Sequence, residues 1–258
     1  MPISETDVTL AILETYWRRL REHTTVDVAI VGAGPSGLAA AWFLRQDSQL
    51  RVAIFESRLS PGGGLWGGGM GYNVAVFEDS SRPIAAQLGI RLEPWRNGLW
   101  VADSIQATAA LIGSALSAGV HVFNLITVED VVVRESAIAG LVIQSTSINM
   151  TGLHVDPLTI AARAVLDATG HEAAVATIAH RKGLTLETPS GHVAGERSMW
   201  ADRGECQVVD MSGRIYPGLY VSGMAASAVR GGHRMGAVFG GMLESARKVA
   251  AAIKQDLA

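Results

Sequence analysis

His154 and Asp156 lie two residues apart in the segment 152–160, and His171 follows Asp156 by fifteen residues. A carboxylate and an imidazole form a donor set that suits Fe(II). Asp156 and His171 both stand next to turn-forming residues, which predicts that both lie at the ligand-binding edge of a sheet. An Asp and a His in such places are also typical of a surface charge and a capped strand end, so the residue types leave both readings open.

A glycine pattern indicates a nucleotide site. The apolar run 26–31 leads into Gly32, Gly34 and Gly37 in the spacing G-x-G-x-x-G, and Glu56 closes the next apolar run nineteen residues later. The glycines allow a tight turn and a close approach to a pyrophosphate, and the helix that follows directs its amides at phosphate. A carboxylate at the end of the next strand can accept both ribose hydroxyls. A tight turn that merely needs small residues is the alternative.

Two further features suit a small anionic ligand. Seven of the twelve residues in 60–71 are glycine, which predicts a loop whose backbone approaches a ligand closely. Arg230 and Arg234 flank a Gly-Gly-His sequence, and their guanidinium groups could clamp a carboxylate. A solvated pair near a helix start is equally consistent with the pattern.

The elements that would position these residues alternate between helical and strand periods. They are an amphipathic helix at 4–22 that should lie against the core or a partner subunit, strand 26–31, helix 36–46, strand 51–55, helix 103–118, strand 120–124, an antiparallel pair at 128–134 and 139–145, strands within 162–171 and 218–224, and a C-terminal helix. This order predicts an α/β, two-dinucleotide-binding (FAD/NAD(P)-binding, Rossmann-like) fold with a small antiparallel excursion.

Composition narrows the classes of function. The 258 residues show no linker, so we expect a single NAD-binding domain over 1–258. With 21 basic and 24 acidic residues the net charge is −3, which predicts neither a nucleic-acid nor a membrane partner. Cys206 is the only cysteine, and the first residues lack the pattern of a signal peptide, so a cytoplasmic location is expected.

A flavin-dependent oxidoreductase is the rival class, because flavoproteins of this superfamily share the glycine pattern. They usually carry a Gly-Asp pair near the end of the last strand, where this chain has Gly223-Met224. A thioether cannot replace a carboxylate acceptor, which argues against a permanent flavin. A non-catalytic NAD sensor is a third reading, and it would not need the set of Asp156, His171 and Arg234.

Several stretches together resemble the Thi4 family of thiazole synthases over nearly the whole chain. They are 31–38, 58–64, 152–160, 167–171, 216–221, 234–236 and 239–242. The resemblance implies that NAD is a substrate that loses nicotinamide, that glycine supplies the thiazole nitrogen, and that the product is an adenylated, carboxylated thiazole used for thiamine. Fungal and plant members carry a sulfur-donating cysteine where this chain has His154, so the resemblance is to the archaeal-type, sulfide-dependent branch.

The resemblance also implies roles for individual residues. It places Asp156 and His171 on Fe(II) and Arg234 on the carboxylate of glycine, with His154 as a general acid–base group or a polar wall. The residues expected around NAD are Gly32, Gly34, Ser36, Gly37, Glu56, Ser57, Gly64, Val128, His154, Val155, Asp156 and Met224. A homo-oligomer, an octamer in the family, is implied, with the iron site shared between adjacent subunits. Ser57 and Ala237 depart from the family pattern, which usually has arginine and proline there.

Overall fold

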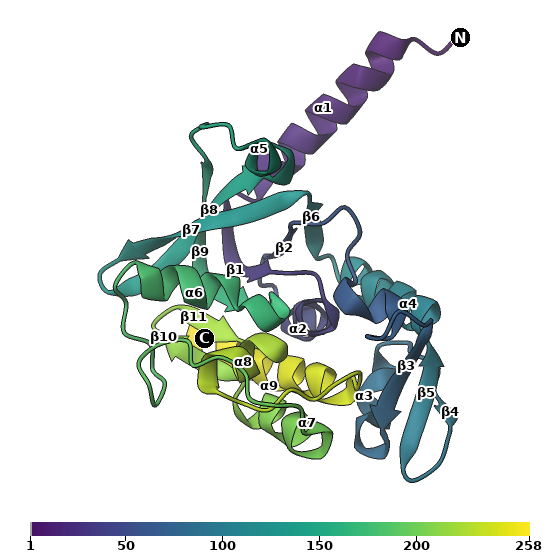
Figure 1. The fold of residues 1–258 in the computed structure, drawn as a ribbon. Coiled ribbons are helices and arrows are strands. Elements are labelled where there is room, and N and C mark those ends of the chain that lie inside the picture. The colour runs from purple at the N-terminus through teal and green to yellow at the C-terminus, as the bar shows by residue number, and fades with distance from the viewer. Residues whose placement is uncertain (1) are drawn as a thin grey trace.

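The computed structural model describes residues 2–258 and has the predicted α/β class. Its main sheet follows the order β10-β11-β9-β1-β2-β6 (Figure 1). These strands are β1 (Thr25–Val31), β2 (Val52–Glu56), β6 (His121–Asn124), β9 (Leu158–Asp167), β10 (Gly213–Tyr216) and β11 (Leu219–Val221). β1 runs parallel to β2 and β9, as expected for strands joined by helical crossovers. The central strands are therefore buried on both faces.

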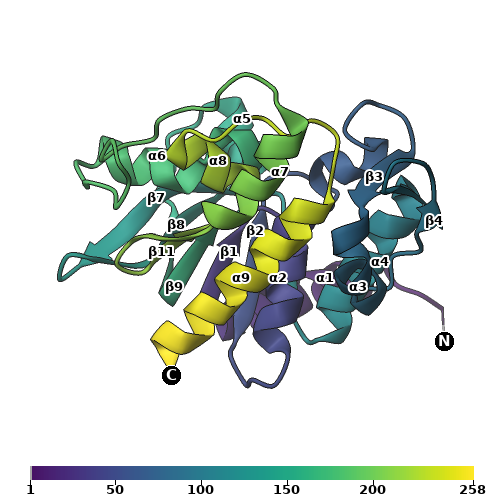
Figure 2. The same ribbon diagram turned by 90° about the horizontal axis from the view of Figure 1, so that it is seen from below.

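Helices cover one face of the sheet. They are α2 (Pro35–Arg45), α4 (Ser104–Ser117) and α9 (Gly240–Leu257). Figure 2 shows α9 lying alongside α2 across this face. Leu38 of α2 and Leu243 of α9 are buried in one cluster with Ile30 of β1. This packing fixes the start of α2, and with it the glycine loop, against the carboxyl end of β1.

The predicted antiparallel excursion is confirmed and lies on the other face. β7 (Ile126–Arg134) pairs with β8 (Ala137–Ser145), and β8 pairs with the first half of β9. α6 (Ala174–Arg181) and α8 (Met224–Arg230) complete this layer. Phe55, Phe123 and Leu141 are buried in its core. β9 thus belongs to the excursion at its start and to the parallel sheet at its end.

A second, three-stranded sheet lies beside the main one and was not predicted. It consists of β3 (Val74–Glu78), β5 (Leu99–Asp103) and β4 (Glu93–Pro94), in the order β3-β5-β4, with η2 (Asp79–Ser81) and α3 (Arg82–Gln87) between β3 and β4. The glycine-rich segment before it contains a short 3-10 helix, η1 (Gly63–Gly67), rather than loop alone. These elements are too short to reveal a hydrophobic period, and tertiary contact forms them. Phe77 packs against Phe239 at the start of α9.

The remaining helices lie at the periphery. They are α1 (Glu5–Glu22), α5 (Thr146–Thr151), η3 (Gly170–Glu172) and α7 (Ala201–Asp210). Ser4 caps α1 by accepting a hydrogen bond from the Asp7 amide at 3.4 Å. Only Leu20 of α1 is buried, and Figure 1 shows the helix projecting from the body, so it does not lie along the core. No helix within residues 2–258 is long and apolar enough to cross a membrane.

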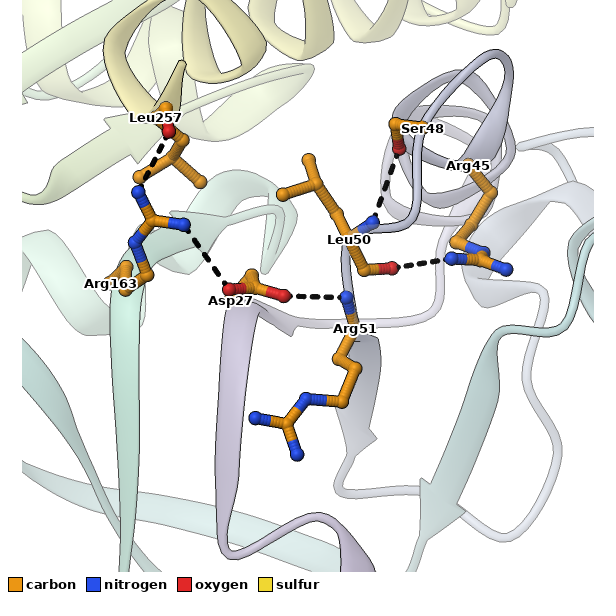
Figure 3. A network of polar contacts seen from close by, with 7 residues as sticks. All are labelled: Asp27, Arg45, Ser48, Leu50, Arg51, Arg163 and Leu257. Carbon is orange, nitrogen blue, oxygen red and sulfur yellow. Dashed lines mark hydrogen bonds and ion pairs between the residues drawn. The ribbon is translucent and has the colours of Figure 1, made fainter.

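A polar network closes the opposite, amino-terminal edge of the sheet (Figure 3). Arg163 on β9 donates to the Leu257 carbonyl at 2.7 Å and to Asp27 on β1 at 3.3 Å. Asp27 also accepts from the Arg51 amide before β2 at 2.8 Å. These bonds tie three segments of the sheet to the end of α9. The loops at the carboxyl-terminal edge of the main sheet lie outside this network and are available to bind a ligand.

Candidate functional site

The glycine loop lies at the carboxyl end of β1. Gly32 has φ 97°, and a Cβ there would come within 2.5 Å of the Ala168 carbonyl oxygen. A Cβ on Gly34 would meet nothing within 4 Å. Gly32 is therefore required by the fold itself. Gly34 leaves open space at the start of α2, where a phosphate would approach the helix amides.

Glu56 is buried at the end of β2 and is fixed by backbone amides. The Ala33 amide donates to one carboxylate oxygen at 2.7 Å, and the Arg58 amide donates to the other at 2.8 Å. The oxygen that accepts from Ala33 keeps a further lone pair. The carboxylate is therefore oriented against the glycine loop and can still accept from a ribose hydroxyl. Ser57, the next residue, contributes its hydroxyl at 3.5 Å.

The glycine-rich segment 60–71 crosses the glycine loop that follows β1. The Gly62 amide donates to the Ala33 carbonyl at 2.7 Å, and a Cβ on Gly63 would come within 3.1 Å of the Gly34 Cα. A Cβ on Gly64 would meet nothing. Residues 60–71 therefore pack against the glycine loop at Ala33 and Gly34, and Gly64 leaves open space beside it.

Serine hydroxyls hold the turn after β11. The Ser36 and Ser222 hydroxyls are 2.5 Å apart, and Ser245 accepts from the Gly223 amide at 3.0 Å. Gly223 has φ 64°, and a Cβ there would lie 2.8 Å from the Ser36 Cβ. Met224 begins α8 and is buried. The turn thus fits closely against the glycine loop and offers a thioether where a flavoprotein would offer a carboxylate.

A buried aspartate shapes the turn that presents His171. Thr169 donates from its amide (3.0 Å) and hydroxyl (2.7 Å) to one oxygen of Asp167, and the Ala176 amide donates to the other at 2.9 Å. Burial raises the pKa of Asp167 above its ordinary value, and these hydrogen bonds offset only part of the rise. The turn is therefore fixed at both ends, and His171 stands exposed on it.

Glu196 joins His171 to Arg234 and was missed by sequence reasoning. Its carboxylate oxygens lie 2.7 and 2.9 Å from Nδ1 of His171, and one lies 3.7 Å from Nε of Arg234. Glu196 lies in a segment without helical or strand period, so no sequence signal marks it. Arg230 is not part of this group: it donates to the Arg214 carbonyl at 2.8 Å, and burial lowers its pKa.

Asp156 and His171 lie beyond opposite ends of β9, so a single chain does not bring their side chains together as the sequence predicts. Asp156 precedes the first residue of β9, and His171 follows the last. β9 pairs Asp167 with Val31 at one end and Ala161 with Thr25 toward the other. At about 3.3 Å per residue the strand alone separates the two side chains by roughly 30 Å along the chain. Within residues 2–258 no three His, Cys, Asp or Glu side chains gather as metal ligands.

The His154 segment is held to the end of β8. Gln144 donates to the Val155 carbonyl at 3.0 Å, and nearby Thr146 donates to the Ser57 carbonyl at 2.9 Å. The segment is thereby connected to the residue that follows Glu56. His154 and Asp156 are exposed. Val128 lies within β7, opposite Ile143 of β8.

The parallel sheet, the glycine loop and the buried Glu56 at the end of β2 define an α/β protein with a Rossmann-like fold of the dinucleotide-binding type. A model of the Thi4 family matches residues 9–239, and the chain belongs to this family. It is 49% identical over 258 residues to a thiamine thiazole synthase of Methanothermobacter thermautotrophicus, covering 100% of both chains. It is 47% identical over 255 residues to one from Pyrococcus horikoshii, covering 99% of both.

A solved structure agrees with the sequence relatives. The crystal structure of Thermovibrio ammonificans THI4 matches with a TM-score of 0.95 at 44% identity, covering 100% of this chain and 99% of that one. The resemblance to Thi4 proteins proposed from the motifs is therefore confirmed, and archaeal proteins are among the relatives.

Proposed function

We propose that this chain is a thiamine thiazole synthase that makes an adenylated, carboxylated thiazole from NAD, glycine and sulfide, with Fe(II). The observation that carries the proposal is full-length similarity to thiamine thiazole synthases. The family resemblance further implies that His154 stands where the sulfur-donating members have a cysteine. A histidine has no sulfur to donate. The reaction is then a transfer that consumes NAD and releases nicotinamide, and the sulfur comes from outside the protein.

The dinucleotide is held by backbone and by Glu56. The open space beside Gly34 and Gly64 suits the pyrophosphate, and Glu56 is oriented to accept from the adenosine ribose. Val155 and His154, connected through Thr146 to Ser57, would close the adenosine side. Met224, buried beside the Ser36 turn, adds apolar contact without a ligand for flavin.

The residues proposed for iron fit it as a site shared between subunits. His171 is exposed, and its Nε2 makes no hydrogen bond to any residue in 2–258. Asp156 is also exposed, and imidazole and carboxylate are donors that Fe(II) accepts. Because β9 separates them in one chain, we propose that Asp156 comes from one subunit and His171 from its neighbour in a homo-oligomer. Bound iron would supply a Lewis acid that holds sulfide close to the substrate.

Arg234 and His154 complete the proposed roles. Arg234 has an exposed side chain whose planar guanidinium can grip the glycine carboxylate through two parallel hydrogen bonds. An imidazole such as that of His154 can act as a general acid–base group near neutral pH. It can equally form a polar wall, and the two roles separate by replacement with Asn, which keeps polarity and removes proton transfer.

The test is anaerobic assay of the purified protein with NAD, glycine, Fe(II) and sulfide, with product identified by mass spectrometry. We expect the adenylated thiazole over many turnovers, strict dependence on added sulfide, and full activity of Cys206→Ala. Loss of one sulfur from the protein mass, or inactivity of Cys206→Ala, would contradict the sulfide-dependent assignment. A flavin spectrum in the purified protein would favour the oxidoreductase instead.

A further inference from the structure

Glu196 occupies a position between two functional side chains. It receives the His171 imidazole at 2.7 Å and faces the Arg234 guanidinium at 3.7 Å, while its own side chain is only 13% exposed. His171 comes from the turn after β9, and Arg234 from the loop between α8 and α9. One carboxylate therefore connects two segments that are far apart in the sequence.

The backbone around Glu196 is fastened on both sides. The Gly195 amide donates to the Ala228 carbonyl at 2.9 Å, and the Arg197 amide donates to the Gly232 carbonyl at 2.8 Å. The Arg234 amide in turn donates to the Arg197 carbonyl at 3.3 Å. These bonds attach the segment to the end of α8 and to the loop that carries Arg234. The carboxylate is consequently held in place and is not a freely rotating surface group.

The contact determines which imidazole nitrogen is free. An ionised carboxylate only accepts hydrogen bonds, so the proton of a neutral His171 lies on Nδ1 and the lone pair lies on Nε2. A carboxylate behind a metal-binding imidazole fixes its orientation and increases its basicity. On the other side, Glu196 faces Nε of Arg234, which leaves the two terminal nitrogens for a bidentate carboxylate.

We propose that Glu196 is a positioning residue that fixes the Nδ1–H tautomer of His171 and the orientation of Arg234, so that the metal ligand and the glycine clamp are aligned together. The ligand and clamp roles rest on the proposed function. The tautomer does not.

The first test uses isotope-labelled histidine and the nitrogen chemical shifts of the metal-free protein, with His171→Gln to assign the signal. At about pH 8.5 an imidazole is ordinarily neutral. We expect the His171 proton on Nδ1 in the natural protein and in Glu196→Gln, whose side-chain carbonyl can still accept. In Glu196→Ala, which lacks this acceptor, the His171 proton should move largely to Nε2. A proton on Nε2 of His171 in the natural protein would overturn the proposal without any variant.

The second test is anaerobic titration with Co(II), followed by visible absorbance. Loss of such a carboxylate typically weakens metal binding by about 10- to 100-fold. We expect this for Glu196→Ala, a smaller loss for Glu196→Gln, and none for Glu244→Gln, which removes a surface ion pair with Arg247 on α9. NAD affinity should stay unchanged in all three.

The two tests separate this proposal from the proposed function. If the tautomer moves in Glu196→Ala but neither protein binds Co(II), the positioning role stands and the iron site is wrong. If Co(II) affinity and tautomer are both unchanged in Glu196→Ala, the positioning role is wrong, whatever the enzyme makes.

Discussion

Replacing Glu205 with glutamine should make the protein more stable than the natural protein as the pH rises from 5.5 to 8. Glu205 of α7 lies against Glu78 at the end of β3, and its carboxylate accepts from the Gly241 amide at the start of α9. Burial, together with a hydrogen bond to Glu78 and its charge, raises the pKa of Glu205 from 4.5 to about 9. Oε1 of Glu78 and Oε2 of Glu205 are buried and have no hydrogen-bond partner outside this pair among residues 2–258. A Cβ on Gly240 would lie 2.1 Å from Oε2 of Glu78 and 2.7 Å from Cβ of Ser81, so the start of α9 packs closely against Glu78.

The raised pKa sets the direction of the pH dependence. The folded protein keeps a proton on Glu205 that the unfolded chain releases above its ordinary pKa. The stability associated with this carboxyl is therefore complete below about pH 4.5 and is lost as pH rises toward 9. Each pH unit in this window costs about 1.4 kcal/mol, so the loss of stability between pH 5.5 and 8 is at most about 3.5 kcal/mol. Because the side chain is partly exposed, we expect about 2 kcal/mol.

Glutamine removes the titration while keeping the contacts. Its amide can donate to Glu78, and its carbonyl can accept from Gly241. Glu205→Gln should thus gain about 2 kcal/mol over the natural protein between pH 5.5 and 8, or roughly 4–8 °C in Tm for a chain of this length. Denaturant unfolding at fixed protein concentration measures it, with Glu244→Gln as control. Equal pH dependence of the stability in the natural protein and in Glu205→Gln would show that Glu205 does not keep its proton in the folded protein.

Other changes test the site directly. Arg234→Lys should lower the apparent affinity for glycine by about thirtyfold to several thousandfold, because losing a charge-assisted pair costs about 2–5 kcal/mol. Steady-state kinetics should show the apparent affinity for NAD unchanged. Equal effects on both substrates would show that Arg234 does not bind glycine. Asp156→Ala and His171→Ala should each be inactive, but coexpressed in equal amounts they should recover about one quarter of full activity through mixed pairs. Verified mixed oligomers without activity would show that each subunit builds its own site. Gly34→Ala should leave the melting temperature unchanged and weaken NAD binding, because its Cβ meets no protein atom. Gly32→Ala should lower the melting temperature, because its Cβ would clash with the Ala168 carbonyl at a positive φ. The reverse pattern would contradict this assignment of Gly34 to the ligand and Gly32 to the fold.

Features within one segment could be predicted from the sequence. The β1-α2-β2 unit was predicted correctly, with the glycines at its first turn and Glu56 at the end of β2, because strand, turn and helix there each follow from residues that are neighbours in the chain. The excursion formed by β7 and β8 was correct for the same reason, since alternation and a turn suffice to predict a hairpin. The small sheet was missed because β4 has two residues, too few to show any period.

In the candidate site, too, local features could be predicted from the sequence and contacts between distant segments could not. The sequence by itself determined which residues carry donor atoms, Asp156, His171 and Arg234, because chemical type is local. Only the tertiary structure decided that the length of β9 keeps Asp156 away from His171, and that Glu196 lies between His171 and Arg234. The separation of Asp156 from His171 depends on the register of β9 beside β1. The position of Glu196 depends on backbone hydrogen bonds between its segment and the end of α8. Both are contacts between segments far apart in the chain, on which local pattern carries no information.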